Sequence, residues 1–294
     1  MKHFRISRLA WALVALVGLS ACGTTGDGRL ADLPLSDVPL NGKFVWHDLI
    51  TNDVAAVKSF YGTLFGWSFE DTEHPNGGDY VLISKDEVWI GGIVYMEDPS
   101  DADYSRWLGY MSVPDVDRAV KQATSAGGSV ALGPLNLGEV GRAAAIMDPQ
   151  QAVVGIIRSR LGDPDDSIEP ALGHLVWDEL IAADTDAAAE FYRKISAAQV
   201  NSVERAGMEY AVLSSHGRHR AGFLQRADES IDPFWLTHVA VTDPAAMTRR
   251  VAELGGAVVL APDKEIFNGA VAVVTDPTGA VLALHQWPLP AEAK

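Results

Sequence analysis

The chain has 294 residues, of which 48% are hydrophobic, and this is long enough for two domains with ordinary cores. Its formal net charge of -16 at pH 7 excludes nucleic acid as a partner and argues against adhesion of the folded part to anionic lipid, because both would repel it. The single cysteine excludes an internal disulfide, so stability must come from the core.

The N-terminus has the pattern of a secretory signal. Basic residues at positions 2, 5 and 8 precede an apolar run over residues 9–19, which is far shorter than the roughly 20 residues of a bilayer-spanning helix. The tetrapeptide Leu19-Ser20-Ala21-Cys22 follows and resembles the lipobox of bacterial lipoproteins. This resemblance implies that residues 1–21 are removed and that Cys22 carries acyl chains such as palmitate. A lone buried thiol in a cytosolic protein is the alternative.

These features predict a lipoprotein of the bacterial cell envelope that contacts the membrane through acylated Cys22 alone. Stable anchoring needs more than one acyl chain, and lipoproteins carry several. Gly23 follows the cysteine, where sorting signals for inner-membrane retention usually have Asp, so the outer membrane is favoured.

Two breaks divide the remaining sequence. Residues 22–41 contain turn formers and prolines without a sustained period, which predicts a tether. Residues 161–171 are acidic and contain prolines, which predicts a linker between domains. We therefore expect one domain over residues 42–160 and a second over residues 172–290.

The two predicted domains are copies of each other. Val45-Trp-His-Asp-Leu-Ile50 matches Val176-Trp-Asp-Glu-Leu-Ile181, and Phe60-Tyr61 matches Phe191-Tyr192 at the same offset. Further matches with a slightly smaller offset pair Trp107-Leu108 with Trp235-Leu236 and Asp148-Pro149 with Asp276-Pro277. Internal similarity over this length indicates a tandem repeat with a small loop deletion.

Each copy also divides into two similar halves. In all four quarters an apolar, strand-like run ends in an Asp that is suited to cap the helix that follows; these residues are Asp53, Asp115, Asp184 and Asp243. About three short β-rich runs follow each helix. The repeating unit is therefore βαβββ, used four times, and the fold class is α+β.

A βαβββ unit used in pairs resembles the vicinal oxygen chelate superfamily, which contains glyoxalases, bleomycin-resistance proteins and extradiol dioxygenases. The motifs that carry the resemblance are Phe60-Tyr61 through Phe65-Gly66-Trp67, Val113-Pro-Asp-Val-Asp117 and Asp276-Pro-Thr-Gly279. The resemblance implies two tandem domains, each a curved-sheet cup with helices outside. It further implies a divalent metal held inside a cup by side chains of three strands.

The standard metal-binding positions of the superfamily hold no ligands in this chain. They lie seven residues before each strand-end Asp and seven residues after the Asp of the last turn. The residues at these positions are Trp46, Leu108 and Gly155 in the first copy and Trp177, Leu236 and Ala283 in the second. Glyoxalase or dioxygenase activity by the usual ligands is therefore not expected.

Strand alternation offers a displaced set of ligands, because the residue two further along each strand faces the same side. In the second copy these residues are Glu179, His238 and His285, and in the first copy they are Asp48, Tyr110 and Ile157. Two imidazoles and a carboxylate suit Fe(II), Mn²⁺ or Zn²⁺. The same residues can equally line a polar pocket without metal, and Glu179 with His238 can act as an acid–base pair.

Two functional hypotheses follow from these residues. In the first, both cups bind a small aromatic or amphipathic molecule between Trp46 or Trp177 and the neighbouring polar groups Asp48 and Tyr110, as bleomycin-resistance proteins capture drugs. In the other hypothesis, the domain over residues 172–290 is a metal-dependent lyase, isomerase or dioxygenase-like oxygenase. The missing standard ligands favour the first. His47 should point away from the cup and be structural.

Overall fold

The computed structural model describes residues 34–73, 79–97, 105–205 and 207–288. The predicted signal peptide, Cys22 and most of the predicted tether lie outside these ranges. Among the described residues, no helix has the length and apolar character to cross a membrane.

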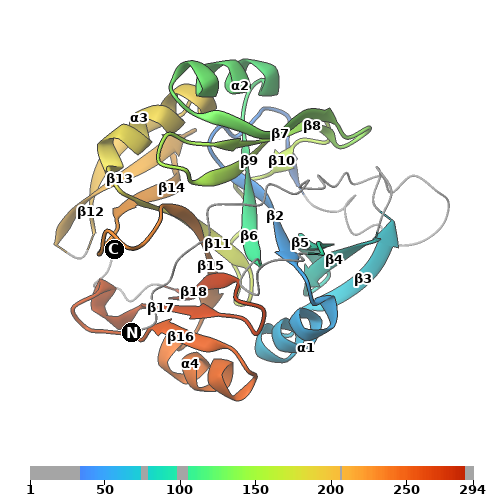
Figure 1. The fold of residues 1–294 in the computed structure, drawn as a ribbon, viewed down its shortest axis with the longest axis vertical. Helices are drawn as coiled ribbons and strands as arrows, with labels where there is room; N and C mark the ends of the chain where they lie inside the picture. The colour runs from blue at the N-terminus through green and yellow to red at the C-terminus, as the bar shows by residue number, and fades with distance from the viewer. Residues whose placement is uncertain (1–33, 74–78, 98–104, 206, 289–294) are drawn as a thin grey trace.

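The first domain is one eight-stranded sheet in the order β3-β4-β5-β2-β6-β9-β8-β7, with one helix after the first strand of each half (Figure 1). Its elements are β2 (Phe44–Thr51), α1 (Val54–Phe65), β3 (Ser68–Glu73), β4 (Asp79–Lys85), β5 (Val88–Tyr95), β6 (Arg106–Ser112), α2 (Val116–Ser125), β7 (Ser129–Asn136), β8 (Gly141–Met147) and β9 (Val153–Ser159). The first strands of the two halves, β2 and β6, are antiparallel neighbours at the centre.

The second domain repeats this order as β12-β13-β14-β11-β15-β18-β17-β16. Its elements are β11 (Leu175–Ala182), α3 (Thr185–Ser196), β12 (Gln199–Arg205), β13 (Met208–Ser215), β14 (Arg218–Gln225), β15 (Phe234–Val241), α4 (Pro244–Glu253), β16 (Ala257–Leu260), the short helix η1 (Phe267–Gly269), β17 (Val271–Thr275) and β18 (Val281–Gln286). A short pair, β1 (Leu35–Ser36) with β10 (Asp163–Pro164), joins the segment before the first domain to the segment after it. The predicted fold of two tandem βαβββ pairs is confirmed.

The four predicted capping residues begin the four helices. Asp53 and Asp115 accept hydrogen bonds from the backbone N–H of Ala56 (2.9 Å) and Arg118 (2.8 Å). Asp184 and Asp243 do the same for α3 and α4. Each carboxylate satisfies a backbone donor that has no partner inside the helix, and this fixes where the chain turns away from the sheet.

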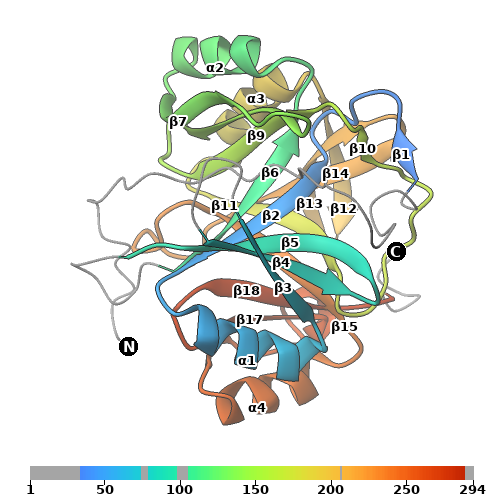
Figure 2. The same ribbon diagram turned by 90° about the vertical axis from the view of Figure 1, so that its right-hand side faces the viewer.

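The two domains pack with their helix-bearing faces together, so that α2 lies against α3 and α1 against α4 (Figures 1 and 2). The motifs that carry the repeat meet across this boundary: the Tyr61 hydroxyl donates to Asp276 (3.0 Å), and the Tyr192 hydroxyl donates to Asp148 (3.1 Å). One buried cluster joins the second half of domain 1 to the first half of domain 2, and another joins the remaining halves. The concave faces of the two sheets therefore point away from each other and form two separate cups.

Candidate functional site

The cup of domain 1 contains a buried carboxylate surrounded by neutral donors. Asp48 on β2 accepts hydrogen bonds from Trp46 Nε1 (3.0 Å), the Tyr80 hydroxyl (2.7 Å) and the Tyr110 hydroxyl (2.9 Å). Burial raises the pKa of Asp48 to about 6, although the three hydrogen bonds favour its charged form. The residues predicted to line this cup therefore face it, and they bond to one another.

Apolar side chains fill the rest of this cup. Leu137 and Val140, which follow β7, pack with side chains from the floor of the sheet. The buried members of this cluster are Ile50, Tyr80, Val94, Met96, Leu108, Tyr110, Leu137, Val140, Ala143 and Ile157. Ile157, which stands where the second copy has His285, belongs to this filling.

Two glycines make room for the tyrosines of this cup. A Cβ atom at Gly92 would lie 1.6 Å from the Tyr80 hydroxyl oxygen, and one at Gly155 would lie 2.2 Å from the Tyr110 ring. Gly155 occupies a standard metal-ligand position, and the Tyr110 ring fills the space above it. Neither Tyr80 nor Gly92 was predicted as a site residue, although the Gly91-Gly92 pair inside a strand indicates a close approach of this kind.

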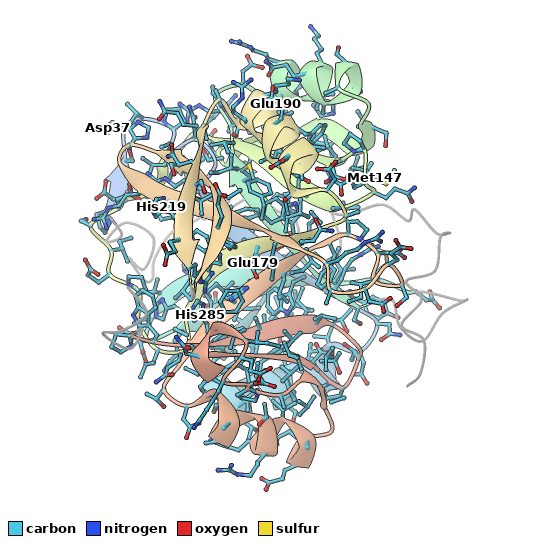
Figure 3. All side chains as sticks on the ribbon, turned by 90° about the vertical axis from the view of Figure 1, so that its left-hand side faces the viewer. Asp37, Met147, Glu179, Glu190, His219 and His285 are labelled. Carbon is cyan, nitrogen blue, oxygen red and sulfur yellow. The ribbon has the colours of Figure 1, made fainter. Side chains whose placement is uncertain are left out.

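The cup of domain 2 brings together the three residues of the predicted displaced set. Trp177 pairs with His238 across β11 and β15, and His238 pairs with Ala283 across β15 and β18, so the residues two further along, Glu179 and His285, share the inner face. His238 Nε2 lies 3.9 Å from Glu179 Oε2, and His238 Nδ1 lies 3.2 Å from His285 Nδ1. Figure 3 places Glu179 and His285 near each other on this side of the molecule.

Tyr210 on β13 and Arg205 on β12 complete this cup, and neither was predicted from the sequence. The Tyr210 hydroxyl donates to Glu179 and, like its counterpart in domain 1, lies over a glycine, Gly222. Trp177 Nε1 donates to the same hydroxyl (3.2 Å). Arg205 Nη1 lies 3.5 Å from Glu179 Oε1, so a cation stands at the edge of the cup.

Burial sets the charge states in this cup. It raises the pKa of Glu179, and the neighbouring Arg205 guanidinium opposes that shift. It lowers the pKa of His238 well below the usual range, helped by His285 and Arg205, and it lowers the pKa of His285 to about 4. His238 Nε2 is buried and has no hydrogen-bond partner among the residues that the structure describes. The cup therefore contains neutral imidazoles, one of which offers an unused nitrogen to a carboxyl group.

The arrangement of these side chains fits a three-ligand metal site only in part. The separation of His238 Nδ1 from His285 Nδ1, 3.2 Å, is about that of two ligands bound to one ion. Glu179 instead faces the opposite ring nitrogen of His238, and the Arg205 cation lies between Glu179 and His285. Within the described part of the chain, no group of three or more His, Cys, Asp or Glu side chains is arranged to hold a metal ion.

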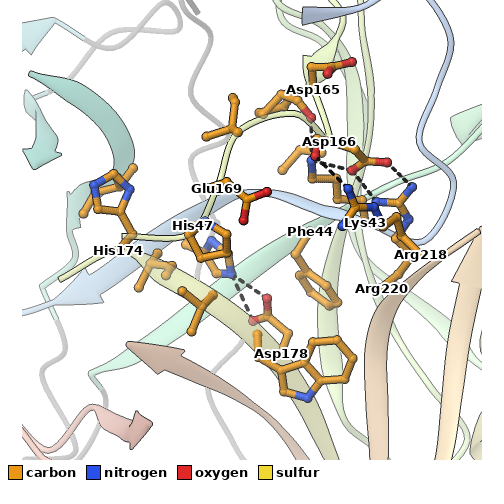
Figure 4. Close-up of a pocket in the computed structure, with 18 of the residues that line it drawn as sticks. Lys43, Phe44, His47, Asp165, Asp166, Glu169, His174, Asp178, Arg218 and Arg220 are labelled. Atoms are coloured by element: carbon orange, nitrogen blue, oxygen red, sulfur yellow. Dashed lines mark hydrogen bonds and ion pairs between the residues drawn. The ribbon is translucent and has the colours of Figure 1, made fainter. Parts of the chain in front are cut away.

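A separate cavity of about 310 Å³ lies between the domains (Figure 4). His47 Nε2 lies 2.9 Å and 3.0 Å from the two oxygens of Asp178, so His47 points away from its cup and pairs with the other domain. Arg220 binds both carboxylate oxygens of Asp166 in the predicted linker (2.6 Å and 2.7 Å), and Lys43 binds one of them (3.1 Å). These charged groups pair with one another, and the pairs join residues of the first domain, the predicted linker and the second domain. The cavity is therefore part of the boundary between the domains.

Comparison with known proteins agrees with this architecture. The model of the Glyoxalase/Bleomycin resistance protein/Dioxygenase superfamily matches residues 43–156 and again residues 171–284. The chain belongs to this superfamily. Its similarity to the "Putative glyoxylase CFP32" of Mycobacterium tuberculosis is 31% identity over 246 residues, which covers 81% of this chain and 92% of that protein. The superfamily assignment therefore rests on both tandem copies.

Two further similarities are to proteins with other descriptions. The "Anthracycline biosynthesis protein DauV" of a Streptomyces species is 29% identical over 254 residues, which covers 81% of this chain and 91% of that protein. The Mn(II)-bound glyoxalase from Novosphingobium aromaticivorans has a TM-score of 0.55 at 13% identity, over 84% of this chain and 82% of that one. This second similarity shows the fold alone.

Proposed function

We propose that this protein binds a small, flat aromatic or amphipathic molecule in the cup of domain 2. The observation that carries the proposal is the buried, unpartnered His238 Nε2, which faces Glu179 across 3.9 Å. Buried polar atoms normally have partners, and an exception at the centre of a concave sheet indicates a place for a ligand atom. Trp177 supplies an aromatic surface beside it.

The domain 1 cup has a different role in this proposal. Both cups have a buried apolar cluster, but Asp48 accepts three hydrogen bonds in the first, whereas His238 Nε2 in the second has no hydrogen-bond partner among the described residues. Domain 1 therefore serves as a structural partner for domain 2. The relatives described as glyoxylase and anthracycline biosynthesis proteins support a small molecule, and the second of them supports a flat aromatic one.

The test uses 2-naphthol, a flat neutral probe, titrated into the full chain by isothermal calorimetry. We expect saturable binding that Trp177→Leu weakens at least tenfold, because this change removes the aromatic wall of the domain 2 cup. Trp46→Leu is the matched control. It removes the equivalent wall of the domain 1 cup and should leave the affinity within twofold. Equal losses in both variants, or no binding to the wild type up to its solubility limit, would overturn the proposal.

A metal-dependent enzyme is the second candidate, and the 3.2 Å separation of the two histidine Nδ1 atoms favours it. Its test is the metal content of the protein purified without a histidine tag. Stoichiometric Fe, Mn or Zn in the wild type, lost in Glu179→Ala and in His285→Ala but kept in His219→Ala, would support it. Metal at background level in the wild type would remove it.

The lipid anchor is part of the same proposal. Cys22 lies outside the described residues, and its role rests on the sequence pattern alone. Cys22→Ala should abolish incorporation of labelled palmitate and release the protein from membranes or block its processing. Equal labelling of the wild type and the variant would contradict the anchor and, with it, the envelope localisation.

A further inference from the structure

We infer that the molecule bound by the domain 2 cup is an acid, and that Arg205 is the residue that selects its carboxylate. This inference rests on the proposed function, because it specifies the ligand of the same cup. It adds a specificity-determining residue on β12 that lies outside the positions where the superfamily places its ligands.

The Arg205 guanidinium is held in the cup by rings. Its Cζ atom lies 4.4 Å from the centre of the Phe267 ring and 5.2 Å from that of the Tyr210 ring. Such stacking orients the plane of a guanidinium and keeps its N–H groups free to point sideways. The orientation of the Arg205 guanidinium is therefore fixed, while its N–H donors make only long contacts.

The polar contacts of Arg205 are long. Nη1 lies 3.5 Å from Glu179 Oε1, and Nη2 lies 3.5 Å from His285 Nε2. Charge-assisted hydrogen bonds between a guanidinium and a carboxylate are normally about 2.7 to 2.9 Å and often doubled. The linker of this same chain shows that geometry, where Arg220 binds both oxygens of Asp166 at 2.6 Å and 2.7 Å. Within the described ranges, Arg205 therefore lacks the close partner that Arg220 has.

The loop that presents Phe267 is strained. Phe267 and Asn268 have φ angles of 48° and 54°, in the left-handed region that a bulky aromatic residue rarely adopts. A bulky residue in this region stores backbone strain, and strain of this kind is concentrated at ligand-binding sites. Here the strained turn positions the ring that stacks on Arg205.

A carboxylate on a flat ligand matches this arrangement. It would take both sideways N–H groups of Arg205, while the ring system of the ligand packs against Phe267 and Trp177. Glu179 keeps the Tyr210 hydrogen bond when the guanidinium turns to the ligand. His238 Nε2, which has no partner, lies on the same inner face and is available to a second polar atom of the ligand.

The experiment compares 2-naphthoate with 2-naphthamide, which have the same flat shape and differ in charge at pH 7. In the full-length wild type we expect calorimetry to give at least tenfold tighter binding of 2-naphthoate. Arg205→Gln should remove this difference, Arg205→Lys should retain part of it, and Arg249→Gln, an exposed arginine on α4 of the same domain, should leave it unchanged. Thermal melts of each variant check that it is folded.

The outcomes separate this inference from the proposed function. Equal affinities of the wild type for the two probes would overturn the role of Arg205 and leave the cup as an aromatic-binding site. Preference for 2-naphthoate that survives Arg205→Gln would place the anion site elsewhere and overturn the inference. Binding of neither probe, nor of 2-naphthol, would overturn both. The first comparison needs no variant, so misfolding of Arg205→Gln cannot hide the answer.

Discussion

The two cups of this protein are built on the same plan and differ in the side chains that surround the carboxylate. Each has a carboxylate on its first strand, a tryptophan two residues earlier and a tyrosine that reaches over a glycine of the adjacent strand. Tyr110 and Ile157 complete the first cup, whereas His238 and His285 stand at the equivalent positions of the second. The first set satisfies its carboxylate, and the second leaves a buried nitrogen without a hydrogen-bond partner in the described part of the chain. Under the proposed function, the shared residues are structural and the residues that differ between the copies form the binding site.

The largest predicted effect tests whether the tyrosine of each cup packs over its glycine in the same way. Gly92→Ala and Gly222→Ala should each destabilise the protein by about 3 kcal/mol or more in urea denaturation, because a Cβ atom at either position would lie 1.6 Å from a tyrosine hydroxyl oxygen. Gly62→Ala, inside α1, is the control and should change stability by less than about 1 kcal/mol. Tolerance of alanine in one cup alone would show that the two tyrosines pack differently.

The next prediction concerns pH. The pKa of Asp48 in the folded protein, about 6, lies above its usual value of 3.8, so the folded state binds this proton more tightly than the unfolded state. The resulting stabilisation is fully present below about pH 4 and is lost as the pH rises through 6. Relative to Asp48→Asn, the wild type should therefore lose about 2 to 3 kcal/mol between pH 4 and pH 7.

Denaturation of both proteins across this pH range provides the measurement. Glu179→Gln should show a change of the same sign, because burial raises the pKa of Glu179 against the opposing effect of the Arg205 cation. A pH-independent difference between the wild type and Asp48→Asn would mean that the three neutral donors keep this carboxyl group charged throughout.

A smaller effect on stability is expected from converting the second cup into the first. In domain 1 the Tyr110 ring lies over Gly155, and in domain 2 the paired residues are His238 and Ala283. The double variant His238→Tyr/Ala283→Gly should therefore gain about 1 kcal/mol, because it removes an unpartnered nitrogen and gives Glu179 a further donor. It should also lose 2-naphthol binding. Retained binding would show that His238 is not part of the ligand site.

The smallest effect should come from a change that touches neither cup. Asp166→Asn weakens the contact of the linker with Arg220 and Lys43, which hold the pKa of Asp166 down to about 2. Because this pair is partly exposed, the loss should be about 1 kcal/mol or less. Calorimetry with 2-naphthol should give the wild-type affinity. A large loss of binding would show that the domain boundary controls the cup.

Local sequence signals predicted most of the fold and part of the candidate site. The capping aspartates, the repeated motifs and the alternation of strands placed four helices and two sheets, and they brought Glu179, His238 and His285 to one face. Alternation gives the face of a side chain but not its reach across a sheet. Tyr80, Tyr210 and Arg205 lie on strands that are not adjacent in the sheet to the strands of the carboxylates they contact. The two tyrosine rings reach those carboxylates because a glycine beneath each ring leaves the space for it. The filling of the first cup by Leu137 and Val140 likewise follows from a loop path that no local pattern specifies.

The hydrogen bonds of Tyr61 with Asp276 and of Tyr192 with Asp148 tie the evolution of the two copies together. Each domain covers the helix-bearing face of the other. A single domain would therefore leave a tyrosine and a broad apolar surface facing water. Deleting either copy should therefore destabilise the other, whatever chemistry each copy performs. Selection that retains one copy consequently retains both.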